Sequence, residues 1–112
     1  MPVLKIQTNI SIHDKQGLLQ TASKHIASVL GKPESYVMVI LDDEVDMLFA
    51  GTDSPLAFLE LKSLGLPENQ TRALSESLCS LIEKELGIDS ARIYIEFASP
   101  ERHMFGWNKA TF

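Results

Sequence analysis

The sequence predicts an α+β fold built from two tandem βαβ repeats, which gives a four-stranded sheet with two helices on one face. Sliding the chain against itself by 56 residues superposes one helix-like segment and the strand-like run after it on a second such pair. A shift of 55 residues superposes the strand-like runs that precede the two helices. Because parallel βαβ crossovers are right-handed, both helices should cover the same face. The matched residues include Leu18 with Leu74, Ile26 with Ile82, Leu30 with Leu86, and Gly31 with Gly87.

The first repeat contains the predicted strand 2–8, with its proline at the position where the missing N–H does least harm. Asp14 offers a carboxylate to the N-terminus of a helix whose apolar stripe spans 18–30. The run 36–41 is apolar and β-branched, which predicts a strand buried on both faces. Residues 47–51 are expected to form a short strand.

The second repeat begins with a predicted strand over 56–61. Pro67 is placed to open a helix, and apolar residues at helical spacing continue over 74–86. The run 93–97 is the last strand of the predicted sheet. The tail, residues 104–112, is rich in aromatic side chains and is expected to add a very short strand.

Composition indicates one domain spanning residues 1–112. Hydrophobic residues make up 45% and charged residues 22%, which is typical of a folded globular chain. The net charge of −5 without a basic run argues against a nucleic-acid partner, and no apolar stretch approaches the length of a membrane span. With no signal peptide and one cysteine, Cys79, a cytoplasmic protein is predicted; secretion without a signal peptide stays open.

One face of the predicted sheet is left without a helix, although it also carries apolar residues. A homo-oligomer is the simplest way to cover such a face. The three histidines show no metal-ligand spacing, so neither a metal nor a cofactor is predicted.

The chain starts with Met1-Pro2, and initiator methionine is usually removed before a small residue such as proline. The new N-terminus would be a secondary amine. An α-amino group has a pKa of about 8, and burial or a neighbouring cation lowers it. Such an amine can act as a general base near neutral pH. Taken alone, however, Met-Pro is weak evidence, and an ordinary first strand is the favoured interpretation of it.

Short motifs distributed over the whole chain together form a sequence signature. They are Met1-Pro2, Thr8-Asn9, Gly31-Lys32-Pro33 followed by Tyr36, Lys62-Ser63-Leu64-Gly65, Arg92-Ile93-Tyr94-Ile95 and the closing Gly106-Trp107-Asn108-Lys109-Ala110-Thr111-Phe112. In this order and spacing they resemble the macrophage migration inhibitory factor (MIF) family of the tautomerase superfamily. The resemblance implies a MIF-like trimeric fold in which sheets surround a central channel and active sites lie between subunits. It also implies keto–enol tautomerisation of 2-keto acids such as phenylpyruvate, without a cofactor.

Matching the family's motifs residue by residue assigns the site. Pro2 would be the catalytic base, and Lys32 would bind the substrate carboxylate or the developing enolate. The backbone N–H of Leu64, beside Ser63, would be a main-chain donor. Tyr94 would reach the pocket from a neighbouring subunit. The remaining substrate-binding residues that the resemblance implies are Tyr36, Glu96, Phe105, Trp107 and Phe112.

The chain departs from the well-known mammalian members at two places. Glu96 stands where they have an asparagine, so a carboxylate that repels the substrate's own carboxylate replaces an amide, and weak activity is expected. The stretch Leu56-Ala57-Phe58-Leu59 stands where they carry Cys-x-x-Cys, which excludes thiol oxidoreductase activity through that motif.

Structural roles compete with these assignments. Lys32 follows a helix-ending glycine and could serve only as a cation near the helix C-terminus. Tyr94, between two isoleucines, has the pattern of a core residue, and Trp107 and Phe112 could anchor the tail. The competing function is a MIF-like binding or signalling protein whose tautomerase pocket is vestigial, with an unknown protein partner. A generic split-βαβ regulatory domain is a third reading, which the tail and Gly31-Lys32-Pro33 disfavour.

Overall fold

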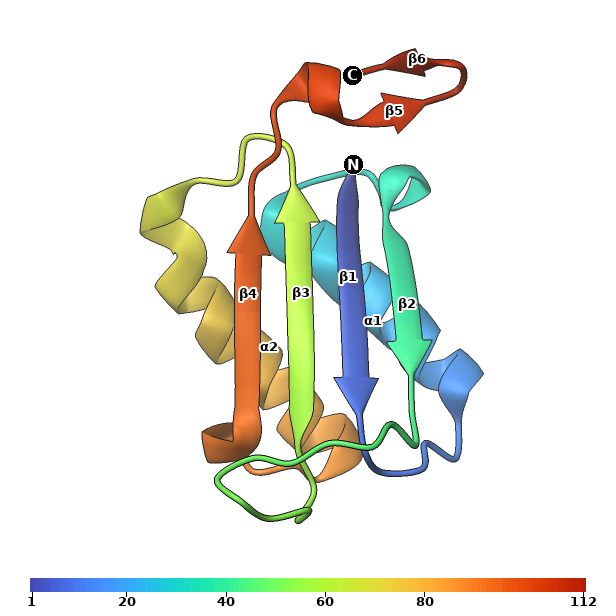
Figure 1. Cartoon of the computed structure of the whole chain (residues 1–112). Helices are drawn as coiled ribbons and strands as arrows, with labels where there is room; N and C mark the ends of the chain where they lie inside the picture. Colours follow the sequence, from blue (N-terminus) through green and yellow to red (C-terminus); the bar gives the residue numbers. More distant parts are fainter.

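A four-stranded sheet with two helices on one face forms the centre of the protein, as the computed structural model of residues 1–112 shows (Figure 1). The strand order is β2-β1-β3-β4. β1 runs parallel to β2 and antiparallel to β3, while β3 runs parallel to β4. This mixed sheet confirms the predicted pair of βαβ repeats. The strands are β1 (Pro2–Thr8), β2 (Met38–Asp42), β3 (Ala57–Ser63) and β4 (Ile93–Ala98).

The element boundaries reproduce the internal repeat of the sequence. α1 (Lys15–Leu30) and α2 (Thr71–Leu86) each have 16 residues, and their bounds are offset by the repeat length. The short 3-10 helices η1 (Glu34–Tyr36) and η3 (Ser90–Arg92) follow them at the same offset. None of the helices combines the length and apolar character needed to cross a lipid bilayer.

The two helices begin differently. At α1 the Asp14 side chain accepts a hydrogen bond of 3.0 Å from the backbone N–H of Gly17, as the cap prediction requires. Pro67, by contrast, precedes a 3-10 turn, η2 (Glu68–Gln70), and the α-helix itself starts only at Thr71. The proline therefore lies further from the α-helix than the sequence predicted.

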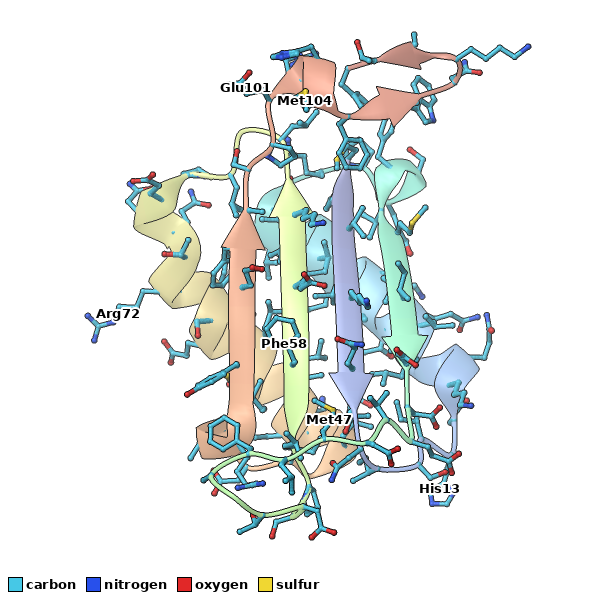
Figure 2. All side chains as sticks on the ribbon, in the orientation of Figure 1. His13, Met47, Phe58, Arg72, Glu101 and Met104 are labelled. Carbon is cyan, nitrogen blue, oxygen red and sulfur yellow. The ribbon has the colours of Figure 1, made fainter.

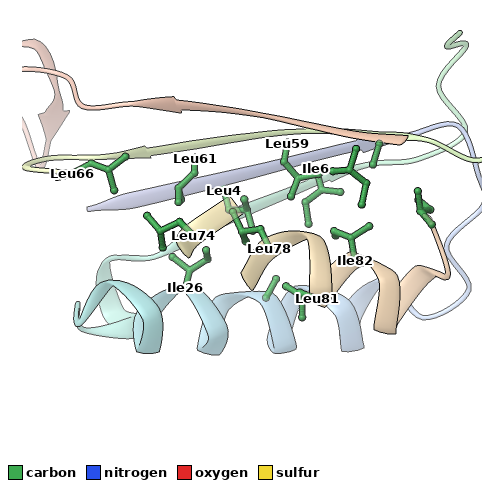
Figure 3. Close-up of a cluster of buried hydrophobic side chains, with 14 residues drawn as sticks. Leu4, Ile6, Ile26, Leu59, Leu61, Leu66, Leu74, Leu78, Leu81 and Ile82 are labelled. Carbon is green, nitrogen blue, oxygen red and sulfur yellow. The ribbon is translucent and has the colours of Figure 1, made fainter. Parts of the chain in front are cut away.

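The core lies between the sheet and the helices (Figure 3). Along β1 and β3 buried residues alternate with half-buried ones, so one face of each strand enters the core. Each fully buried aliphatic side chain stabilises the fold by about 1.5–3 kcal/mol. The large side chains that are fully buried in this cluster are Leu4, Ile6, Ile26, Leu59, Leu61, Leu78, Ile82 and Ile88.

The face of the sheet turned away from the helices mixes apolar and charged residues. Figure 2 shows Phe58 of β3 on this face, and Met38 is exposed on the edge strand β2. The strand register places Lys5 opposite Glu60, and Glu60 opposite Glu96. The expected apolar residues are present, but a charged row crosses the middle of the sheet.

β2 is an edge strand, which corrects the prediction of a strand buried on both faces. It pairs only with β1, and the first residue of the run 36–41 belongs to η1. Val39 and Leu41 pack against the core, whereas Met38 and Ile40 alternate with them and are exposed. An unbroken apolar run does not by itself separate the two kinds of strand.

Residues 47–51 do not form the predicted strand. Phe49 and Thr52 exchange two backbone hydrogen bonds of 3.0 and 3.1 Å across a tight turn. Ala50 and Gly51, at the tip, have φ angles of 53° and 75°. Two successive residues with positive φ reverse the chain within two positions, so the segment cannot continue as a strand.

The tail forms a small hairpin beyond the sheet. It consists of η4 (Arg102–Met104), β5 (Gly106–Trp107) and β6 (Ala110–Thr111). In Figure 1 the hairpin lies over the end of the sheet where β1 begins. The short strand expected in the tail is therefore present as a pair of strands.

Candidate active site

The first component of the site is the beginning of β1. Pro2 is the first residue of the strand and lies in register with Ser63, the last residue of β3. A proline at this position can begin a strand inside a sheet because it removes no interior ladder hydrogen bond. Pro2 is fully buried, and Met1 before it is buried as well. The predicted catalytic residue is therefore enclosed by protein.

Lys32 reaches the same end of the sheet from the segment that follows α1. Gly31 adopts a left-handed conformation with φ of 61°, and the backbone N–H of Lys32 then donates to the carbonyl oxygen of Ala27 at 3.0 Å. The Lys32 Nζ lies 3.4 Å from the carbonyl oxygen of Leu64, directly after β3. The helix end thus directs a cation toward the paired ends of β1 and β3.

Ser63 and Leu64 are both buried here. The hydroxyl oxygen of Ser63 has no hydrogen-bond partner, whereas the carbonyl oxygen of Leu64 accepts from Lys32. Both predicted residues therefore lie beside Pro2, where β1 begins.

An aromatic cavity of about 260 Å³ adjoins this end of the sheet. Tyr36 lines it from η1, and Phe105, Trp107 and Phe112 line it from the tail. The ring centroids of Tyr36 and Trp107 are 5.6 Å apart, as are those of Trp107 and Phe112. These separations are in the range of favourable aromatic pairs. The structure thus gathers all four predicted aromatic wall residues.

Hydrogen bonds within the tail fix the position of Phe112. The backbone N–H of Phe112 donates to the carbonyl oxygen of Phe105 at 3.1 Å. The Nε of Arg102 donates to the carbonyl oxygen of Phe112 at 3.0 Å. The C-terminal residue is therefore fixed from both sides, and its ring stays in the cavity wall.

Sequence reasoning missed six lining residues, among them Met1, Val3 and Met38. Val3 and Met38 are register partners on neighbouring strands. The period-2 alternation of β1 was the available signal for Val3, because that residue lies on the opposite face from the core residue Leu4. Met38 could not be found in this way, because the apolar run 36–41 predicts a strand buried on both faces.

The charge state of the N-terminal amino group is shifted at this end of the sheet. Burial, and after it the Lys32 ammonium, lowers the pKa of the Met1 α-amino group below its ordinary value of 8.0. Both effects oppose the protonated form. The surroundings therefore favour a neutral amine, which is the form that accepts a proton.

Tyr94 and Glu96 do not reach the cavity of their own chain. Tyr94 is in register with Phe58, which lies opposite Gln7 near the far end of β1. Five residue steps separate that position from Pro2, a distance of about 17 Å along β1. The Tyr94 side chain is 66% exposed, which contradicts a core role for it.

Glu96 lies midway along the edge strand β4, on the uncovered sheet face. It is in register with Glu60, and two strands separate it from the strand that carries Met38. It is exposed and makes no ion pair. Contact of Glu96 or Tyr94 with a substrate at Pro2 therefore requires a second copy of the chain.

The gathered groups are suited to proton transfer. No three His, Cys, Asp or Glu side chains in residues 1–112 are grouped closely enough to hold a metal ion. What the site offers is an amine, a cation and an apolar wall. A neutral amine can remove a proton, and a cation in a partly enclosed site stabilises the negative charge that develops.

Known proteins resemble this chain over its full length. The family profile described as "Macrophage migration inhibitory factor (MIF)" matches residues 1–112. A macrophage migration inhibitory factor homolog of Trichuris trichiura is 38% identical over 114 residues and is covered over 100% of both chains. The macrophage migration inhibitory factor of Mus musculus is 32% identical, with 100% of this chain and 99% of the mouse chain covered. Among solved structures, the homologue from Prochlorococcus marinus superposes with a TM-score of 0.94 at 41% identity, over 98% of each chain.

Proposed function

The chain belongs to the macrophage migration inhibitory factor family, and on that premise we propose that it is a cofactor-free keto–enol tautomerase of phenylpyruvate-type 2-keto acids. One observation carries the proposal. Pro2, Lys32 and the four aromatic wall residues come from distant parts of the sequence and meet at one end of the sheet. An amine base beside a cation and an aryl-sized apolar cavity suits a substrate that has an acidic C–H, a carboxylate and an aromatic ring.

The Pro2 amine is the proposed base. It requires removal of Met1, because the Pro2 nitrogen is a non-basic amide while Met1 is attached. Burial and the Lys32 charge, which lower the pKa of the Met1 amino group, act in the same direction on an amine at Pro2. The neutral amine takes a proton from C3 of the substrate. The electron pair of that C–H bond then forms the C2=C3 double bond, and the carbonyl π electrons move onto oxygen.

Lys32 and the neighbouring backbone are the proposed stabilisers of that oxygen. The Lys32 ammonium balances the enolate or the substrate carboxylate, and the N–H of Leu64 is a second donor from the end of β3. Donors that are in place before charge develops cost little reorganisation at the moment of reaction. Protonation of the enolate oxygen then gives the enol, and the reverse sequence gives the ketone.

A homotrimer completes this proposal. A partner would cover the exposed apolar side chains of the uncovered sheet face, such as Met38 and Ile40, and Tyr94 and Glu96 meet Pro2 only if another copy supplies them. Native mass spectrometry at micromolar protomer concentration should give three times the 12.5 kDa chain mass, less any removed methionine. A stable monomer would remove both residues from the proposed site.

The alternative function is MIF-like binding or signalling with a vestigial pocket. It is supported by the relatives' names, since the mouse and Trichuris proteins are named for macrophage migration inhibition. The two functions need not use the same atoms, so an inactive variant that keeps its fold separates them. Partner binding that survives loss of the Pro2 amine would favour the alternative.

The decisive experiment combines intact mass with isotope exchange on one preparation. Mass spectrometry reports whether Met1 is removed, and NMR in D2O follows exchange of the C3 hydrogens of phenylpyruvate. Pro2→Gly keeps a removable methionine but replaces the rigid secondary amine. We expect it to retain the fold and lose about 10² to 10⁴-fold in kcat/KM, the usual contribution of a positioned general base. Wild-type exchange rates in Pro2→Gly would end the proposal.

A further inference from the structure

The inference concerns Arg92, the last residue of η3, at the end of the sheet opposite Pro2. Its guanidinium binds four backbone carbonyl oxygens of one loop. The Nε donates to Pro55 at 3.1 Å and Nη1 to Phe49 at 3.2 Å. The Nη2 donates to both Thr52 at 3.2 Å and Ser54 at 3.0 Å. A planar guanidinium is the side chain whose donors can span several acceptors in this way.

The loop bound by Arg92 is also held by Asn9, whose Nδ2 donates to the carbonyl oxygen of Asp53 at 2.8 Å and whose Oδ1 accepts from the backbone N–H of Leu56 at 3.0 Å. Between β2 and β3 it contains no regular strand or helix. Its tightest part is the turn from Phe49 to Thr52, with positive φ at the two residues between them. By donating hydrogen bonds to the carbonyl oxygens of this turn and of the next residues, Arg92 fixes the loop to the start of β4.

The Phe49 ring contacts both Arg92 and Tyr94 and so links them. The guanidinium carbon lies 5.2 Å from the centroid of the Phe49 ring, a cation–π distance. On its other side, Phe49 meets the Tyr94 ring edge to face at a centroid distance of 4.8 Å. Because Tyr94 is otherwise largely exposed, the Phe49 ring is what restricts its orientation within the chain.

We propose that Arg92 is a positioning residue for substrate choice: through Phe49 it fixes the Tyr94 ring, and so sets a preference for aryl over aliphatic 2-keto acids. This inference rests on the proposed function, in which Tyr94 enters the pocket of a neighbouring copy. An ordered ring forms a wall for the aryl group. A ring that rotates freely offers the same area without a fixed position, and loses part of the benefit of preorganisation.

The test compares two substrates rather than one rate. C3 hydrogen–deuterium exchange is measured with phenylpyruvate and with pyruvate, which has no aryl group. We expect Arg92→Met to lower the ratio of the two kcat/KM values by about tenfold, since small misplacements of binding groups carry effects of this order or larger. Arg92→Lys keeps the charge but lacks the planar fork, so it should not restore the ratio.

Arg72 provides the matched control. It extends into solvent from α2 (Figure 2), and Arg72→Met removes the same charge. This variant should keep the wild-type ratio. Phe49→Leu is a second test that leaves the Arg92 side chain intact, and it should lower the ratio in the same direction. It also guards against the case in which Arg92→Met fails to fold.

The possible outcomes separate this inference from the proposed function. If Arg92→Met and Phe49→Leu reduce exchange of both substrates equally, their role is structural and the inference is wrong. An unchanged ratio in active variants overturns it as well. Wild-type protein that lacks Met1 and exchanges neither substrate overturns the proposed function, and the inference with it.

Discussion

The two βαβ repeats share a backbone plan but use equivalent positions for different purposes. Each helix ends at a glycine in the left-handed conformation, Gly31 in the first repeat and Gly87 in the second. The next residue is Lys32 in one case and Ile88 in the other. Ile88 is completely buried in the core, whereas Lys32 approaches the N-terminal amino group. The same helix end is therefore a packing position in one repeat and a charge-placing position in the other.

A second equivalent pair lies at the last residues of η1 and η3. Tyr36 closes the first and lines the aromatic cavity, while Arg92 closes the second and binds the loop after β2. Because β1 and β3 are antiparallel, these equivalent residues lie at opposite ends of the sheet. The duplication thus supplies two similar ends. One encloses an amine, and the other presents Tyr94 outward.

The largest expected difference between the repeats is in stability. Ile88→Ala should lower the free energy of unfolding by about 2–5 kcal/mol, because it removes buried methyl groups and leaves a cavity. Lys32→Met at the equivalent position should change it by less than about 1 kcal/mol, since its one hydrogen bond is long. Chemical denaturation at a fixed protomer concentration measures both. A similar loss in the two variants would show that Lys32 is a structural residue.

Catalysis should reverse the order of these two variants. Lys32→Met should lower kcat/KM by about 10- to 100-fold through loss of the oriented cation. It should also shift the acid limb of the pH–rate profile to higher pH. Lys32 lowers the pKa of the amine, so its removal raises that pKa, and a higher pH is then needed to form the neutral base. An acid limb that stays in place would mean that Lys32 does not act on the base.

The repeat was the part of the fold that the sequence predicted best. Helix stripes, the Asp14 cap and the glycine ends are local patterns, and the 56-residue match doubled the evidence for the stripes and the glycine ends. The loop at Phe49 was not predictable, because its shape depends on hydrogen bonds from Arg92, which is 43 residues away. Its apolar residues have the composition of a strand, but no neighbouring strand pairs with it.

The site was predicted only in part for a similar reason. The aromatic wall could be named from the signature, and the structure gathers Tyr36 and the tail in one cavity. Tyr94 and Glu96 could be named but not placed, since their distance from Pro2 follows from the strand order and register rather than from spacing along the chain. The resemblance implies a neighbouring subunit for Tyr94, and the strand order and register give the physical reason for it and extend it to Glu96.

A smaller effect is expected at Glu96, the residue equivalent in the repeat to Ile40 of β2. A substrate carboxylate about 5 Å from an ionised Glu96 would be repelled by roughly 3 kcal/mol at an effective dielectric of 20, before screening. Glu96→Asn should therefore raise kcat/KM for phenylpyruvate severalfold. Steady-state kinetics from pH 5 to 8 tests this.

Glu60 is the matched control for Glu96, because it carries the same charge one strand away in the same row. Glu60→Gln should give a smaller gain if the effect depends on contact with the substrate. Equal gains in the two variants would indicate a general reduction of negative potential. If Glu96→Asn leaves kcat/KM unchanged across the pH range, Glu96 does not face the substrate.

The smallest effect is expected between the helices, where the repeats differ at His25 of α1 and its equivalent Leu81 of α2. The His25 Nε2 lies 2.7 Å from the hydroxyl oxygen of Ser77, and burial lowers the pKa of His25 below its ordinary 6.5. The unfolded chain therefore binds more protons than the folded chain as the pH falls through 6.5, and this contribution to stability is lost toward lower pH. His25→Gln should flatten the stability profile between pH 7 and 5. Ser77→Ala should lower the free energy of unfolding by about 1 kcal/mol at pH 7, the usual contribution of one side-chain hydrogen bond. If the free energy of unfolding of His25→Gln falls as steeply with pH as that of the wild type, groups other than His25 cause the pH dependence.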